Sequence, residues 1–252
     1  MKNILIVGSS GFLGSVVTAH LASKHNIFAA DINKVSLKIL KKKNPKINIK
    51  YLDVSKEKDV KNYFFYLKKK KIFINSLINL AAIDSKVSLK GNTSIYINNQ
   101  RYWNKEIEVS VNGNLNLFKY FGNAMVKKKT GKFILIGSDL SVIAPNQNIY
   151  KKAFKNYLKP PSYPILKHAL LGITKYYASI YAKDNVNVNM ISPGSIDNNP
   201  PKKFQDEFKL IVPSKRMATR QNILPSIDFL LDENNTYING QNILIDGGRS
   251  II

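Results

Sequence analysis

The chain has 252 residues, of which 44% are hydrophobic and 22% charged, and these are ordinary values for a globular protein with a sizeable core. It contains no cysteine, which excludes disulfide scaffolds, zinc fingers, iron–sulfur clusters and cysteine nucleophiles. The net charge of +23 comes almost entirely from lysines spread along the chain, which favours a solvated surface over a nucleic-acid site.

Short apolar runs alternate with longer amphipathic segments. The runs predict strands at residues 4–7, 27–30, 47–52, 76–80, 132–136, 186–191 and 242–245. The amphipathic segments predict helices at residues 12–23, 35–43, 57–71, 105–129, 163–183 and 223–231. Because the runs are mostly continuous, the strands are expected to be covered on both faces. This order predicts one α/β domain, a doubly wound parallel sheet of about seven strands with helices on both faces.

Three segments do not fit the alternation. Residues 83–104, 139–162 and 195–222 are polar or rich in turn formers and lack a helical or strand period. Loops of this length are usually functional or disordered. Each follows a predicted strand, so all three are expected at the carboxyl ends of the strands, where open α/β sheets bind ligands.

A glycine-rich turn joins the first predicted strand to the first predicted helix. Gly8, Gly11 and Gly14 are spaced by three residues, and Ser10 lies between them. Residues without a Cβ permit a tight turn and close approach of a pyrophosphate, while the helix N-terminus offers free N–H groups. Such a turn can also be purely structural, so the neighbouring motifs decide its meaning.

Asp31 stands at the end of the second predicted strand, 17 positions after Gly14. A carboxylate there can accept both hydroxyls of an adenosine ribose and would repel a 2′-phosphate, which favours NAD over NADP. Two alternatives stay open: Asp31 caps the following helix, or Lys34 accommodates NADP.

The next two strand ends extend the predicted nucleotide site. Asp53 and Val54 follow the third strand, where they are expected to meet the adenine. Asn79, Ala81 and Ala82 follow the fourth, and the small alanines would let a cofactor lie flat against the sheet edge.

Tyr163 and Lys167 are four residues apart and share one face of a predicted helix. A neighbouring ammonium group favours the phenolate and lowers a tyrosine pKa from about 10, which makes the phenol a general acid–base. An isolated pair of this kind is more often a solvated helix face. Ser138, after the fifth strand, and Asn112, in the preceding helix, strengthen the functional interpretation.

The combined order of these motifs resembles the short-chain dehydrogenase/reductase family over nearly the whole chain. Residues 187–194 and 240–248 are similar to the family's sixth-strand and closing segments. The resemblance implies a Rossmann fold and hydride exchange between a nicotinamide and an alcohol or ketone. It also implies catalytic roles for Tyr163 (proton exchange), Lys167 (nicotinamide ribose), Ser138 (substrate orientation) and Asn112 (a proton-relay water).

The motifs and the resemblance together give the cofactor-binding set, and no carboxylate–histidine cluster suggests a metal. The set is Gly8, Ser10, Gly11, Phe12, Leu13, Gly14, Asp31, Ile32, Asp53, Val54, Asn79, Ala81, Ala82, Tyr163, Lys167, Pro193, Gly194 and Ile196.

Ser138 and Tyr163 are 25 positions apart, roughly twice the family's usual spacing. Residues 81–87, 144–150 and 216–218 are similar to a subgroup encoded with bacterial surface-sugar and flagellin-glycosylation pathways, including legionaminic-type nonulosonates. This second resemblance implies a sugar or sugar phosphate as substrate. A cluster of basic residues is expected either to hold a phosphate or, through Arg216, to anchor its loop: Lys202, Lys203, Lys209, Lys215 and Arg216. The alternatives are a non-catalytic NAD-binding regulator or partner subunit, and a sugar-nucleotide epimerase or dehydratase.

The predicted helix at residues 163–183 is apolar nearly all round, which predicts burial on two sides. One side is expected to meet the sheet and the other a second subunit, and the resemblance to the family implies a homodimer or homotetramer assembled through this helix. No apolar run approaches the roughly 20 residues that a membrane helix needs. A cytoplasmic protein without nucleic-acid or membrane partners is expected.

Overall fold

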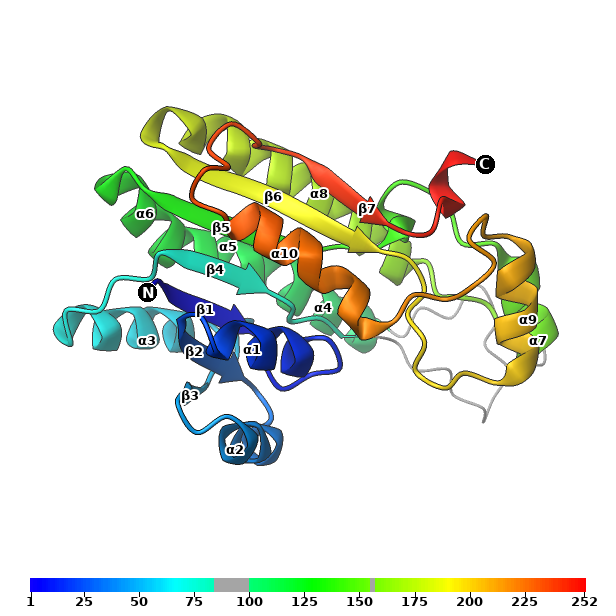
Figure 1. Cartoon of the computed structure of the whole chain (residues 1–252), viewed down its shortest axis with the longest axis horizontal. Coiled ribbons are helices and arrows are strands. Elements are labelled where there is room, and N and C mark those ends of the chain that lie inside the picture. The colour runs from blue at the N-terminus through cyan, green and yellow to red at the C-terminus, as the bar shows by residue number, and fades with distance from the viewer. Residues whose placement is uncertain (84–99, 155–156) are drawn as a thin grey trace.

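Seven parallel strands form the centre of the computed structural model, which describes residues 1–83, 100–154 and 157–252 (Figure 1). Their order across the sheet is β3-β2-β1-β4-β5-β6-β7. The strands are β1 (Asn3–Val7), β2 (Asn26–Asp31), β3 (Asn48–Tyr51), β4 (Ser76–Asn79), β5 (Gly131–Ile136), β6 (Val186–Pro193) and β7 (Asn242–Ile245). The order reverses at β1, because β2 and β4 pair with its two sides.

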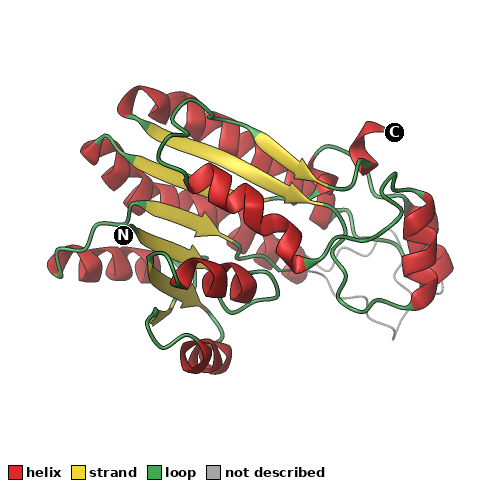
Figure 2. Cartoon of the chain, in the orientation of Figure 1, coloured by secondary structure: helices red, strands yellow, loops and turns green. Residues whose placement is uncertain are grey.

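Helices cover both faces of this sheet (Figure 2). One face carries α1 (Gly14–Ala22), α2 (Lys34–Lys43) and α10 (Leu224–Leu231). The other carries α3 (Glu57–Lys69), α4 (Gln100–Ile107), α5 (Gly113–Leu117), α6 (Asn123–Lys128) and α8 (Ser162–Tyr181). No helix within the described ranges is long and apolar enough to cross a membrane.

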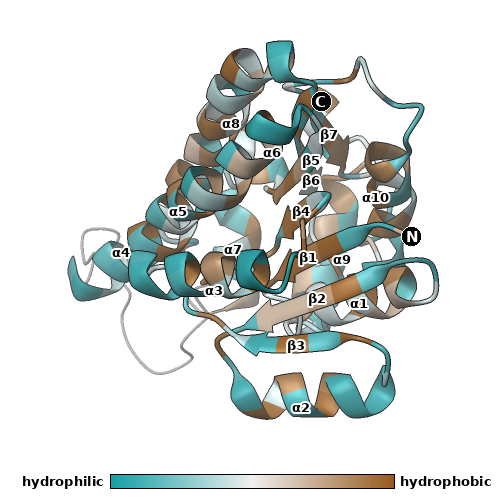
Figure 3. Cartoon of the chain, turned by 90° about the vertical axis from the view of Figure 1, so that its left-hand side faces the viewer, coloured by the Kyte–Doolittle hydropathy of each residue, from teal (hydrophilic) through white to brown (hydrophobic). Residues whose placement is uncertain are grey.

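Side chains of the central strands alternate between two cores. On β1, Leu5 and Val7 belong to the core under α3 and α8, whereas Ile4 and Ile6 belong to the core under α1 and α10. Both faces are therefore buried, which confirms the predicted doubly wound α/β fold. The four residues of β3 are exposed, because β3 is an edge strand, and here the expectation of burial on both faces was wrong (Figure 3).

The helix before β5 is longer and less regular than predicted. It begins at Gln100 rather than residue 105, and π-helical turns at Glu108–Asn112 and Phe118–Gly122 separate α4, α5 and α6. Phe118, in the second of these turns, stacks on Phe133 and Tyr177 with ring centroids 3.9 and 3.8 Å away. This stacking fixes the helix against β5 and α8.

Two of the irregular segments contain helices that the sequence pattern did not predict. Residues 139–162 include α7 (Gln147–Ala153), and residues 195–222 include α9 (Lys202–Leu210). The two helices pack together beyond the carboxyl ends of the strands, around a small core of Ile149, Phe204, Phe208, Val212 and Met217 (Figure 1). We call α7 and α9 the outer lobe. Of the third segment, residues 84–99 lie outside the described ranges.

Candidate active site

The glycine turn after β1 presents bare backbone at the carboxyl edge of the sheet. Gly8 has a φ of +72°, and a Cβ on it would stand 2.7 Å from the Ala81 nitrogen. A Cβ on Gly14 would overlap the Gly8 carbonyl oxygen. The buried hydroxyl of Ser10 has no hydrogen-bond partner among the described residues. The bare backbone of the glycine turn at the N-terminus of α1 and this hydroxyl fit a pyrophosphate, so the residues present suit a dinucleotide.

Asp31 connects this turn to the end of β2. One carboxylate oxygen accepts a hydrogen bond from the Ser10 nitrogen and the other from the Asn33 nitrogen, each at 2.9 Å. Asn33, not Asp31, caps α2, because its side chain accepts from the Ser36 nitrogen at 3.0 Å. The carboxylate is thus fixed beside the glycine turn, which argues against the capping alternative.

Two adjoining cavities run along the carboxyl ends of the strands. The first, the Asp31 cavity, has a volume of about 990 Å³ and is lined by the predicted residues Asp31, Ile32, Asp53, Val54, Ala81 and Ala82. The second, the Tyr163 cavity, measures about 420 Å³ and is lined by Phe12, Leu13, Gly14, Ser138, Tyr163, Lys167, Pro193, Gly194 and Ile196. They share Gly8, Gly11, Leu80 and Ala82, so together they form one elongated cleft.

Asn79 lines neither cavity and instead supports the cleft from below. Its Oδ1 accepts a hydrogen bond from the Ala81 nitrogen at 3.0 Å, and its Nδ2 donates to Asn114 Oδ1 at 2.9 Å. The side chain therefore shapes the strand end on which a cofactor would rest.

The structure does not bring Asn112 to the cleft. Asn112 is exposed and lines neither cavity, whereas Ser110 and Asn114 are buried. Residues two apart on a helix point roughly half a turn away from each other. The proton-relay role expected of Asn112 therefore has no geometric support, and the helix face that meets the sheet contains Ser110 instead.

Tyr163 and Lys167 lie on the first turns of α8, as predicted. Lys167 is 8% exposed, and its ammonium group donates to the Ile136 carbonyl oxygen at 3.0 Å. The same ammonium lies 5.5 Å from the centroid of the Tyr163 ring. Ile136 is the last residue of β5, and Ser138 follows it by two residues. The hydrogen bond from Lys167 therefore connects α8 to the end of β5, next to Ser138.

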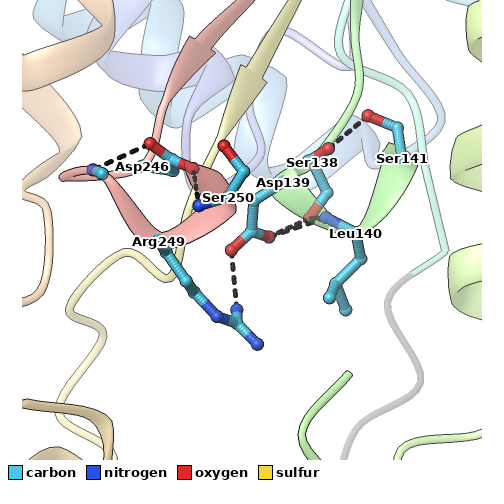
Figure 4. A network of polar contacts seen from close by, with 8 residues as sticks. Ser138, Asp139, Leu140, Ser141, Asp246, Arg249 and Ser250 are labelled. Carbon is cyan, nitrogen blue, oxygen red and sulfur yellow. Dashed lines mark hydrogen bonds and ion pairs between the residues drawn. The ribbon is translucent and has the colours of Figure 1, made fainter. Parts of the chain in front are cut away.

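A buried polar chain holds Ser138, and sequence reasoning missed it. The Ser138 hydroxyl donates to Asp139 Oδ1 at 2.9 Å, while Arg249 donates to Asp139 Oδ2 at 2.6 Å (Figure 4). Ser138, Asp139 and Arg249 are 6%, 2% and 6% exposed, and all three line the Tyr163 cavity. Arg249, from the segment after β7, thus reaches into the site. The spacing of Asp139 and Arg249 in the sequence did not indicate this pair.

Asp246 fastens this closing segment. Burial opposes its ionisation, but hydrogen bonds from Ser250 and from the Gly248 nitrogen outweigh burial and hold the Asp246 pKa below its ordinary value. The Asp246 carboxylate accepts hydrogen bonds from the backbone nitrogens of the residues before and after Arg249, Gly248 at 3.0 Å and Ser250 at 2.8 Å (Figure 4). Asp246 therefore fixes the backbone from which Arg249 reaches Asp139.

Lys159 is a third residue, after Asp139 and Arg249, that the sequence did not single out. Its ammonium group lies 3.9 Å from the centroid of the Tyr163 ring, in the lining of the Tyr163 cavity. Gln147, the first residue of α7, holds its backbone with two hydrogen bonds: the Lys159 nitrogen donates at 2.9 Å and the Lys159 oxygen accepts at 3.1 Å. The residues that lengthen the segment between Ser138 and Tyr163 thus include α7, whose first residue fixes the Lys159 backbone.

The basic cluster proposed for phosphate lies elsewhere. Lys202, Lys203, Lys209, Lys215 and Arg216 are exposed and do not line the Tyr163 cavity. The Arg216 guanidinium instead contacts the Met217 carbonyl oxygen at 3.3 Å and Asn222 at 3.4 Å. This arrangement favours the alternative in which Arg216 anchors its loop.

A doubly wound sheet with a glycine turn, an acidic residue after β2, and a Ser–Tyr–Lys set in the adjoining cavity defines an NAD(P)-dependent oxidoreductase acting on CH–OH groups. The family described as enoyl-(acyl carrier protein) reductase matches residues 13–250. The chain belongs to this family, within the short-chain dehydrogenases/reductases.

Individual relatives agree with this assignment. The chain is 27% identical to a 3-oxoacyl-(acyl-carrier-protein) reductase of Buchnera aphidicola subsp. Schizaphis graminum, over 98% of this chain and 96% of the relative. It is 30% identical to the 2-dehydro-3-deoxy-D-gluconate 5-dehydrogenase of Bacillus subtilis, over 58% of this chain and 55% of the relative. The crystal structure of a short-chain dehydrogenase from Leptospira borgpetersenii with bound NAD+ matches with a TM-score of 0.85 and 27% identity, covering 99% and 92% of the two chains.

Replacing Gly14 with alanine is expected to destabilise the protein by about 1–3 kcal/mol, because the new methyl group overlaps the Gly8 carbonyl. The displaced turn should also weaken NAD binding, measured by calorimetric titration alongside urea unfolding. Gly172→Ala is the matched control, since a Cβ there meets nothing within 4 Å and lies in a helix that alanine favours. Unchanged NAD affinity in the Gly14 variant would show that the turn is not the binding surface.

Proposed function

We propose that the protein interconverts a secondary alcohol and a ketone on a sugar-like substrate, with Tyr163 as the general acid–base. The observation that carries this proposal is the Tyr163 cavity, where Tyr163, Lys167 and Ser138 line one space that continues into the Asp31 cavity. A nicotinamide dinucleotide bound along this cleft would supply the hydride chemistry. The chain's own residues position the substrate and move the proton.

Tyr163 exchanges a proton with the substrate oxygen through its hydroxyl group. Positive charge at Lys167 favours the phenolate and so assists proton removal from an alcohol. The hydroxyl proton of Ser138 is already donated to Asp139, and its oxygen accepts a hydrogen bond from the Leu140 nitrogen at 3.2 Å, which leaves one lone pair to accept from a substrate hydroxyl. Ser138 therefore orients a hydroxylated substrate beside Tyr163.

Polar side chains at the far end of the Tyr163 cavity support a sugar-like substrate. Asp139, Asn198 and Arg249 line it with Ser138. The Bacillus subtilis relative is named for a sugar acid, and another relative, from Listeria innocua, is an NAD-dependent glycerol dehydrogenase. With the subgroup resemblance of residues 144–150, these features support a role in surface-polysaccharide or nonulosonate biosynthesis. The full-length match to 3-oxoacyl-(acyl-carrier-protein) reductases makes a 3-oxoacyl thioester the second candidate substrate.

A substrate panel tests the proposal. The purified protein is mixed with NAD+ or NADP+ and with polyols, sugar acids and sugar phosphates, or with NADH or NADPH and a 3-oxoacyl thioester, and the absorbance of the reduced nicotinamide is followed. Turnover of a sugar derivative supports the proposal. Turnover of the thioester alone would replace it with the second candidate.

We also propose that NAD is preferred over NADP, because Asp31 is fixed in its cavity by two backbone N–H groups. Asp31→Ala is expected to weaken NAD binding by about 10–100-fold, the equivalent of hydrogen bonds to a charged group, while NADP binding does not weaken because the repulsion of its 2′-phosphate is removed. Calorimetric titration measures both affinities, with the exposed Asp232→Asn as a charge-matched control. Equal losses for NAD and NADP would contradict the assigned preference.

Assembly through α8 is proposed as well. Ile165, Tyr176 and Ile180 on this helix are 52%, 62% and 41% exposed. Large apolar side chains gathered on one helix are typical of a subunit interface. Analytical ultracentrifugation of the protein and of an Ile180→Glu variant tests whether a dimer or tetramer forms through this surface.

A further inference from the structure

Arg220 lies beside the glycine turn, although it is far from that turn in the sequence. Its guanidinium carbon is 5.1 Å from the centroid of the Phe12 ring. Phe12 stands between Gly11 and Gly14 in the turn and lines the Tyr163 cavity. A side chain from the irregular segment at residues 195–222 therefore reaches the surface that suits a pyrophosphate.

The packing of α1 beside α10 brings Arg220 to this position. Both helices cover the same face of the sheet (Figure 1), and His20 Nε2 of α1 lies 2.8 Å from a carboxylate oxygen of Asp228 of α10. Phe12 precedes His20 by eight residues, and Arg220 precedes Asp228 by eight. The two helices therefore run in the same direction from the carboxyl edge of the sheet, so that the residues before α10 meet the residues before α1.

The backbone at Arg220 is fixed to the wall of the Tyr163 cavity. The Ala218 nitrogen donates to the oxygen of Ser195, which lines this cavity, at 3.0 Å. The Thr219 nitrogen donates to Asn222 Oδ1 at 2.8 Å, and Arg220 begins the 3₁₀ turn that leads into α10. The Arg220 side chain therefore starts from a defined point next to the site.

The positive charge of Arg220 is not neutralised by a carboxylate of the residues that the structure describes. Asp228, the acidic residue of α10, is already in contact with His20 at 2.8 Å and with Lys24 at 3.5 Å. The glycine turn and α1 contain no acidic residue. Arg220 thus adds positive charge next to the N-terminus of α1, where the helix dipole already favours an anion.

A guanidinium group is well suited to a diphosphate. Its planar fork can donate two parallel hydrogen bonds to one phosphate group. Contact with an aromatic ring stabilises the cation without using its N–H donors. The Phe12 ring can therefore hold the Arg220 side chain at the turn while its N–H groups remain able to bind phosphate oxygens.

We propose that Arg220 binds the diphosphate of the nicotinamide dinucleotide together with the backbone of the glycine turn. The segment at residues 195–222 then contributes to cofactor binding through an ionic contact in addition to Ile196, which lines the Tyr163 cavity. The proposal does not depend on which alcohol is the substrate, because NAD and NADP share the diphosphate.

Calorimetric titration tests this proposal without turnover. The probes are NADH and ADP-ribose, which share the diphosphate and differ in the nicotinamide. Titrations at low and at high ionic strength compare the wild type with Arg220→Met and Arg220→Lys. Lys128→Met is the charge-matched control, because Lys128 is an exposed lysine at the end of α6 that lines neither cavity.

We expect Arg220→Met to bind both probes about 10–100-fold more weakly than the wild type, the usual effect of losing hydrogen bonds to a charged group. Salt screens ionic contacts, so the wild-type affinity should fall more steeply with ionic strength than the affinity of Arg220→Met. Arg220→Lys should keep the steeper salt dependence but bind less tightly than the wild type, since it retains the charge and loses the fork. Lys128→Met should match the wild type.

Unchanged affinity in Arg220→Met would overturn the proposal. A loss for NADH alone would also overturn it, because the contact would then lie at the nicotinamide. A loss for both probes with unchanged salt dependence would show that Arg220 only shapes the turn through Phe12. If urea unfolding shows that Arg220→Met does not fold, Arg220→Lys decides: weaker binding of both probes supports the proposal, and wild-type affinity refutes it.

Discussion

Tyr163→Phe is expected to lower kcat by about 10²–10⁴-fold, the usual contribution of a positioned general acid–base. Only the hydroxyl group is removed, so the ring should keep its contact with the ammonium group of Lys159. NAD affinity should stay within about twofold, because the pyrophosphate and ribose surfaces lie at the glycine turn and Asp31. Steady-state kinetics on the substrate found by the panel, combined with calorimetric titration of NAD, measures both effects.

Tyr237→Phe is the control for this prediction, since Tyr237 is 99% exposed and lines neither cavity. Its kinetics should match those of the wild type. Retained turnover in Tyr163→Phe would show that Tyr163 is not the general acid–base. A joint loss of turnover and NAD binding would instead indicate that the phenol supports the cofactor surface.

The strands were predictable because a buried parallel strand needs little more than a continuous apolar run. Ile4 to Val7 pack into the cores on both faces of the sheet, and this requirement for four consecutive apolar residues is visible in the local sequence. The outer lobe has a weaker signal, which is limited to Phe204 and Phe208 four residues apart in α9. The seven residues of α7 bury Ile149 alone, and its partners Phe204 and Phe208 lie more than fifty positions away. A contact between two distant insertions does not create a local period.

The misplaced Asn112 has a different origin. It was chosen by motif order, whereas the helix geometry required a residue on the buried face. Glu106, Ser110, Asn114 and Phe118 are all buried and follow one another at intervals of four. Three of these four residues are polar, so no apolar period marks the buried face in the sequence. The structure excludes Asn112, because a residue midway between two buried positions faces outward.

Lys159, Asp139 and Arg249 could not be found from local pattern, because each acquires its role by tertiary contact. Asp139 and Arg249 are 110 positions apart, and they meet only when β5 and β7 take their places in the sheet. By contrast, Tyr163 and Lys167 were predictable because their relation is set by one helical turn.

Arg249→Met is expected to destabilise the fold by about 3–5 kcal/mol, because it leaves the Asp139 carboxylate buried without its partner. Urea unfolding measures this loss. The double variant Asp139→Asn/Arg249→Met should recover most of the stability, since no uncompensated charge then remains. Lys152→Met is the matched control: its ion pair with Glu207 is partly exposed, so its loss should cost about 1 kcal/mol or less.

Arg249→Met and the double variant also distinguish the contribution of the ion pair to stability from its role in positioning the Ser138 hydroxyl. In the double variant the Ser138 hydroxyl can donate only to an amide oxygen, which is a weaker acceptor than a carboxylate and is no longer fixed by a guanidinium, so the serine is held less firmly. We therefore expect restored folding but an increased KM for the substrate, with NAD affinity unchanged. If the double variant regains both stability and the wild-type KM, the buried pair serves the fold alone. If Arg249→Met is as stable as the wild type, water must reach Asp139, and the cavity wall is more open than its 2% exposure indicates.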